Sequence, residues 1–68
     1  MIKLGARFWD DKNYRSLIPD GIDNYGLYRC IVEEMMPTRF DDTADFEWRM
    51  TGTVIVRKSY LESLEVIA

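Results

Sequence analysis

Apolar and polar side chains alternate most regularly between Phe46 and Arg57. The apolar positions in this stretch are Phe46, Trp48, Met50, Val54 and Val56. A period of two is that of a β-strand with one buried face, so the stretch predicts β structure. Gly52 interrupts the pattern near its middle and predicts a hairpin bent at Thr51-Gly52. The alternation predicts that Met50, Val54 and Val56 are buried and that Arg49, Thr51 and Thr53 are exposed.

Shorter patterned stretches lie at both ends of the chain. Residues 2–9 alternate and predict a first strand, with Trp9 on the face opposite its aliphatic residues. Ser59 and Glu62 have the spacing of a capping box, which predicts a short helical turn. Residues 64–67 alternate weakly and predict a last strand.

The stretch between the first strand and residue 26 is rich in Asp, Asn, Ser, Gly and Pro. Pro19-Asp20-Gly21 is a strong turn signal within it. We therefore expect residues 10–26 to be a long connection with at most one helical turn, around Tyr14, Leu17 and Ile18.

Residues 27–36 fit two structures. Their apolar positions recur at helical spacing, and Pro37 would end such a helix. Gly26 and the β-favouring composition after it favour a strand. We expect a mainly β fold; the alternative is an α+β fold with a helix at about 24–36 packed on a sheet.

Residues 48–61 resemble the second half of SH3-like barrels. They offer, in order, a strand that opens with Trp, a tight hairpin, another strand and a turn that holds Tyr60. The resemblance implies a single SH3-like barrel or a strongly bent antiparallel sheet. It would place Trp9, Trp48 and Tyr60 near the groove with which that family binds proline-rich peptides. Phe8-Trp9-Asp10 replaces the family's Tyr-Asp-Tyr pattern and Arg57 replaces its Pro, so we carry over the barrel and not the ligand.

Length and composition limit the classes of protein. With 68 residues, 47% hydrophobic and 31% charged, the chain is expected to fold as one domain, 1–68, with a thin core that leaves self-association open. A single cysteine excludes an intrachain disulfide, and no apolar run has the length of a signal peptide or a membrane span, so we expect a cytoplasmic protein that binds no membrane. The net charge of −3 disfavours nucleic acid as a partner.

Candidate chemistry is sparse. The chain has no histidine, and its four glycines form no phosphate-binding motif, so we expect no catalytic residues and no cofactor. Cys30 is expected to be a buried structural residue. Asp41, Asp42 and Asp45 lack the spacing of a calcium loop, so we expect no metal site and interpret them as a solvated loop.

The nine aromatic residues favour a protein-binding surface, because Trp and Tyr often anchor interfaces. The candidate partner-binding residues are Trp9, Tyr25, Tyr28, Trp48 and Tyr60. We expect Trp9 to be the exposed anchor, with Tyr25 and Tyr28 beside it, and Trp48 to line the core. The expected function is a small intracellular, non-enzymatic module that binds a larger protein, of the phage- or mobile-element inhibitor or accessory-subunit type. The alternatives are an acidic DNA mimic and a small enzyme or enzyme subunit.

Overall fold

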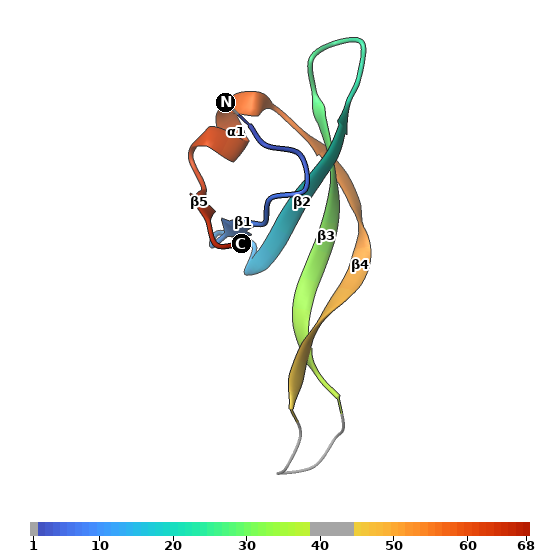
Figure 1. Ribbon diagram of the computed structural model, residues 1–68, viewed down its shortest axis with the longest axis vertical. Helices are drawn as coiled ribbons and strands as arrows, with labels where there is room; N and C mark the ends of the chain where they lie inside the picture. The colour runs from blue at the N-terminus through green and yellow to red at the C-terminus, as the bar shows by residue number, and fades with distance from the viewer. Residues whose placement is uncertain (1, 39–44) are drawn as a thin grey trace.

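Residues 2–38 and 45–68 are described by the computed structural model. The elements are β1 Phe8–Asp10, β2 Arg15–Ile22, β3 Tyr28–Pro37, β4 Phe46–Val56, α1 Lys58–Glu62 and β5 Glu65–Val66. The strands pair antiparallel in one sheet of order β4-β3-β2-β1-β5 (Figure 1). The expected mainly β fold is confirmed, and the ambiguous stretch 27–36 forms a strand from Tyr28 onward, not a helix. No described helix has the length and apolarity that crossing a membrane requires.

The core lies on one face of the sheet, which we call the core face. Phe8 pairs with Leu17, and Leu17 pairs with Val32, so these three side chains point to the same side. The buried apolar residues are Phe8, Leu17, Tyr28, Cys30, Val32 and Leu61. Residues 2–6 and α1 pack over this face, as Ile2, Ala6 and Tyr60 show by their contacts with the buried cluster.

The helical turn predicted after β4 is confirmed, but the predicted capping box is wrong. Arg57 occupies the N-cap position and makes no side-chain capping bond, so Ser59 lies inside the helix. The helix is held instead by Leu61, which is fully buried on the core face. The weak last strand is confirmed as β5, which pairs with β1.

β4 is one continuous strand, so the predicted hairpin at Thr51-Gly52 is wrong. Val32 pairs with Gly52 and Glu33 pairs with Met50, which leaves Thr51 without a partner on β3. This is a β-bulge, in which one extra residue reverses the face on which the following side chains lie. Alternation read through the bulge therefore assigns one half of the strand to the wrong face.

The two halves of β4 show this reversal. Val54 and Val56 are partly buried and pack against the core, as expected. Met50 is 61% exposed, so its predicted burial is wrong, and Trp48 lies on the face opposite the core. Arg49, Thr51 and Thr53 are exposed, as predicted.

β2 occupies the stretch that the sequence indicated as a connection, so the helical turn expected there is also wrong. Pro19 pairs with Cys30 and Gly21 pairs with Arg29, which makes Asp20 a second bulge. A strand tolerates proline and glycine at such an irregular position, and there they gave a false turn signal. The first strand is shorter than expected, because Gly5 has a φ of +88° and turns residues 2–6 over the core.

β3 and β4 extend beyond the rest of the sheet. The pairing of β2 with β3 ends at Ser16 and Glu33, whereas β3 and β4 remain paired as far as Pro37 and Phe46. We call this two-stranded part, residues 34–38 and 45–49, the arm; it projects away from the other strands in Figure 1. The radius of gyration is 13.2 Å, against about 11 Å for a compact chain of this length.

Candidate functional site

The face of the sheet opposite the core carries a second set of apolar side chains, and no described element covers it. We call it the open face. Its apolar residues are Trp9, Ile18, Ile31, Met35, Phe46, Trp48, Met50 and Ile55. Phe46, Met50 and Ile55 are 66%, 61% and 61% exposed. Contiguous exposed apolar surface on a small domain is typical of an interaction site.

Three aromatic rings form a cluster where the open face meets β1. The ring of Trp9 lies edge-on to Tyr14, with centroids 5.2 Å apart, and edge-on to Trp48 at 6.5 Å. Tyr14 has a φ of +53°, a conformation unusual for a residue other than glycine, and its side chain is largely exposed. The cluster therefore joins the turn after β1 to the base of the arm.

Arg7 fixes the position of Trp48 on the open face. Its guanidinium lies 4.2 Å from the centre of the Trp48 ring. Its Nη2 forms an ion pair of 2.7 Å with Glu33, and its Nη1 donates to the Ser16 hydroxyl at 2.7 Å. Ser16 in turn donates to the backbone carbonyl of Glu33. These contacts join residue 7 to β2, β3 and β4.

The structure brings together only two of the five predicted partner-binding residues. Trp9 and Trp48 meet on the open face, so Trp48 does not line the core as expected. Tyr25 is 89% exposed in the β2–β3 turn, at the end of the molecule opposite the arm (Figure 1). Tyr28 is buried on the core face, so it does not share an exposed surface with Trp9 or Tyr25.

Tyr60 lies on the core face, where its hydroxyl contacts Asp10. It is therefore on the opposite side of the sheet from Trp9 and Trp48. The aromatic groove that the resemblance to SH3-like barrels implied is not formed by these three residues.

Sequence reasoning missed most of the exposed apolar residues of the arm and the strands beside it. Phe46 and Met50 were assigned to the buried face because the alternation was extended through the bulge. Met35 and Ile55 were not singled out as surface residues. Gly52 was the available signal, since a glycine inside a strand often marks a bulge.

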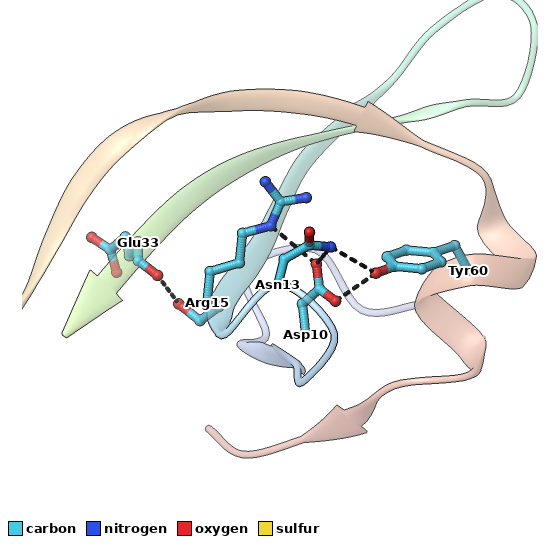
Figure 2. Close-up of polar contacts among 6 residues, drawn as sticks. Asp10, Asn13, Arg15, Glu33 and Tyr60 are labelled. Atoms are coloured by element: carbon cyan, nitrogen blue, oxygen red, sulfur yellow. Dashed lines mark hydrogen bonds and ion pairs between the residues drawn. The ribbon is translucent and has the colours of Figure 1, made fainter.

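A second polar arrangement lies on the core face, centred on Asp10 (Figure 2). The carboxylate is fully buried and both its oxygens accept hydrogen bonds. Oδ1 accepts from the Tyr60 hydroxyl at 2.5 Å, and Oδ2 accepts from Asn13 Nδ2 and from Arg15 Nε, each at 3.0 Å. Asn13 Nδ2 also lies 3.4 Å from the Tyr60 oxygen. The cluster thus joins β1, the following turn, β2 and α1.

Burial and hydrogen bonding set the protonation states of this cluster. Burial alone would raise the pKa of Asp10, but hydrogen bonds from Tyr60, Asn13 and Arg15 outweigh it and hold this pKa below the ordinary value of 3.8. The hydrogen bond to Asp10 and burial raise the pKa of Tyr60 above 10.0. At neutral pH the carboxylate is charged and the phenol is protonated.

Cys30 is fully buried on the core face, as expected. Desolvation, with a smaller contribution from Asp20, raises the pKa of its thiol to about 11.

Within residues 2–38 and 45–68, no three side chains of the metal-ligating types come together. Asp41 and Asp42 of the expected acidic loop lie outside the described residues, and Asp45 is exposed at the end of the arm.

No protein-family model, no curated protein and no solved structure matches this chain.

Proposed function

We propose that this protein is a non-enzymatic binding module that receives an extended segment of a larger protein along the free edge of β4. The observation that carries the proposal is the arm. It is a two-stranded ribbon with apolar side chains on its open face and no third strand or covering layer among the described residues.

A two-stranded ribbon is marginally stable in water unless another strand or layer covers it. Met35 and Phe46 at the arm are 47% and 66% exposed, so folding alone leaves much of their apolar surface in water. Burial of such surface contributes about 25 cal/mol per Å² to an association. A partner that covers the open face of the arm would gain this free energy.

The edge of β4 offers the backbone groups for the same partner. β4 is eleven residues long and lies at the end of the sheet. It contains no proline and no lysine, two residues that commonly protect edge strands, and the bulge at Thr51 is its main irregularity. An extended segment can pair with such an edge while its alternate side chains contact the open face.

The charged residues of the arm give no reason for a second copy of this chain, rather than another protein, to bind along β4. Arg49 and Glu47 are already paired within β4 at 2.8 Å, so neither needs a partner across a new strand pair. Selectivity would come from the apolar side chains around Trp48, which a foreign segment can complement. An accessory or inhibitory subunit that acts by occupying a surface fits this arrangement.

The titratable groups favour binding over catalysis. A general acid or base works best with a pKa near the operating pH. The pKa of Asp10 is shifted downward, and those of Tyr60 and Cys30 are shifted upward, so all three move away from neutrality.

The ion pairs argue against an acidic DNA mimic. Four of the described carboxylates are paired with arginines, which weakens the negative electrostatic field that a DNA mimic would need.

The test is a selection of short random peptides displayed on phage, with the whole protein as bait. Met50→Lys places a charge on the open face at an exposed site, and Ile22→Lys makes the same change at a 55% exposed site away from the arm. We expect peptides with alternating apolar residues to bind the wild type and Ile22→Lys equally and Met50→Lys at least about tenfold more weakly. Amide hydrogen exchange with one purified peptide should slow along β4.

Three results would overturn the proposal. The first is equal binding of the selected peptides to Met50→Lys and to the wild type, and the second is protection outside β3 and β4. The third is concentration-dependent dimerisation of the wild type in sedimentation experiments that Met50→Lys abolishes, because the occupant would then be a second copy.

A further inference from the structure

A groove crosses the surface between the turn after β1, the end of β4 and α1, on the side of the molecule opposite the open face. It is shallow and open to solvent, with a volume of about 610 Å³, and its polar and charged lining residues include Lys12, Asn13, Arg15, Arg57, Ser59 and Tyr60. Nothing in the proposed partner binding uses this groove.

The groove is locally cationic in an acidic protein. Three of its lining residues are Lys or Arg and none is Asp or Glu, whereas the whole chain has a net charge of −3. Lys12 and Arg57 are exposed and form no ion pair within the described part of the chain. Their charges are therefore available to a ligand.

Asp10 orients Arg15 without occupying all its donors. Only Nε of Arg15 bonds to the carboxylate, and Figure 2 shows the two terminal nitrogens directed away from it. Neither terminal nitrogen has a hydrogen-bond acceptor among the described residues. A guanidinium held in this way presents a fixed pair of N–H donors, the geometry that binds two oxygens of one phosphate.

The buried carboxylate does not cancel the positive charge of the groove. Asp10 is paired with Arg15, and Glu34 lines a second pocket with Asn13 and Arg15. These two carboxylates lie on the Arg15 side, so the positive charge that remains in the groove is that of Lys12 and Arg57. Both Asp10 oxygens already accept hydrogen bonds, so it has no free acceptor to direct at a ligand. The neighbouring Asp11 accepts a hydrogen bond from the Trp9 indole on the other side of the sheet.

We propose that this groove binds the phosphoryl group of a small molecule. Arg15 and Arg57 supply guanidinium donors, Lys12 supplies a compact charge, and the Ser59 hydroxyl, which has no described hydrogen bond, supplies a further donor. The site is built from side chains on three elements, which explains why a search for glycine-rich phosphate motifs in the sequence does not find it.

The experiment is a titration of the whole protein with inorganic pyrophosphate, followed by amide chemical shifts in NMR. Saturable shifts are expected at residues 12, 13, 57 and 59. Arg57→Gln and Lys12→Gln change exposed residues and should keep the fold, and each is expected to weaken binding about tenfold. Lys58→Gln, which removes an exposed charge beside the groove but outside its lining, should change binding less than about twofold.

Other ligands separate a phosphoryl site from general charge attraction and from a phosphoprotein site. Acetate at the same concentration should give no saturable shifts. If pyrophosphate gives none up to about 10 mM, or if Lys58→Gln weakens binding as much as Arg57→Gln, the proposal is wrong. It is also wrong if a phosphoserine peptide binds while pyrophosphate does not, because the ligand would then be a modified protein segment.

Discussion

The hydroxyl of Tyr60 donates a hydrogen bond of 2.5 Å to the carboxylate of Asp10, fifty residues earlier in the chain. Asp10 is the only described carboxylate with no exposed surface, so its charge depends on this bond and on those from Asn13 and Arg15. An unsatisfied buried acceptor is costly, and the cluster therefore holds α1 against β1.

Tyr60→Phe should destabilise the protein by about 1–3 kcal/mol, because it removes the only donor to Asp10 Oδ1 among the described residues. Urea unfolding at pH 7 measures the change. Tyr25→Phe is the matched control, since Tyr25 is 89% exposed and its hydroxyl has no described partner. Equal stability of the two variants would contradict the role given to Tyr60.

Acid should destabilise the protein through Asp10. Its folded-state pKa lies below the unfolded value, because hydrogen bonds to the charged form outweigh the cost of burial. The stabilisation is therefore present above about pH 4 and is lost as the pH falls through the folded pKa. Unfolding free energies measured from pH 6 downward should fall for the wild type. Asp10→Asn should be less stable at pH 6 and should show a shallower fall; an identical pH profile would exclude Asp10 as the cause.

Cys30 should destabilise the protein in alkali and resist modification at neutral pH. Burial raises its folded pKa to about 11 from an ordinary 9.0, so its contribution is complete below pH 9 and decreases as the pH rises towards 11. Iodoacetamide at pH 8 should label the native thiol far more slowly than the urea-unfolded thiol. Cys30→Ala should remove the part of the decrease in unfolding free energy between pH 9 and 11 that is due to ionisation of the thiol. Rapid labelling of the native protein would contradict its burial.

The sequence predicted the elements of the fold where periodicity was undisturbed. The strand character of residues 46–56 and 28–36, the short helix and the last strand are all present. The predictions were wrong wherever an extra residue entered a strand. At Thr51 it reversed the faces, and at Asp20 the neighbouring Pro19 and Gly21 concealed a strand whose Leu17 is fully buried.

The candidate sites were less predictable than the fold, because they depend on pairing between distant segments. Trp9 and Trp48 share a face only because β1, β2, β3 and β4 are neighbours in that order. Lys12, Arg15 and Arg57 line one groove only because α1 folds back over the turn after β1. Neither relationship follows from spacing along a single chain, and only a prediction of the register could supply it.

Val54 and Met50 provide a direct test of the bulge. Val54→Ala should cost about 1 kcal/mol, because the side chain is partly buried against the core. Met50→Ala should change the unfolding free energy by less than about 0.5 kcal/mol, because Met50 is 61% exposed on the open face. Chemical denaturation measures both variants. A larger loss for Met50→Ala than for Val54→Ala would show that the bulge is placed wrongly.

Arg7→Lys should separate the geometry of the guanidinium from its charge. Arg7 uses two nitrogens on two partners, Glu33 and Ser16, while its plane lies over the Trp48 ring. Lysine keeps the charge but loses the planar fork and the stacking. Because both side chains of the Arg7–Glu33 pair are only about one-fifth exposed, we expect the unfolding free energy to fall by about 1–2 kcal/mol. Iodide quenching of tryptophan fluorescence should increase as Trp48 becomes more accessible.

Arg49→Lys is the control, because the Arg49 side chain is 51% exposed and is paired within its own strand. It should alter neither the unfolding free energy nor the quenching. If Arg7→Lys also leaves both unchanged, the contacts of Arg7 do not hold Trp48 in place, and the base of the arm must be ordered by the strand pairing alone.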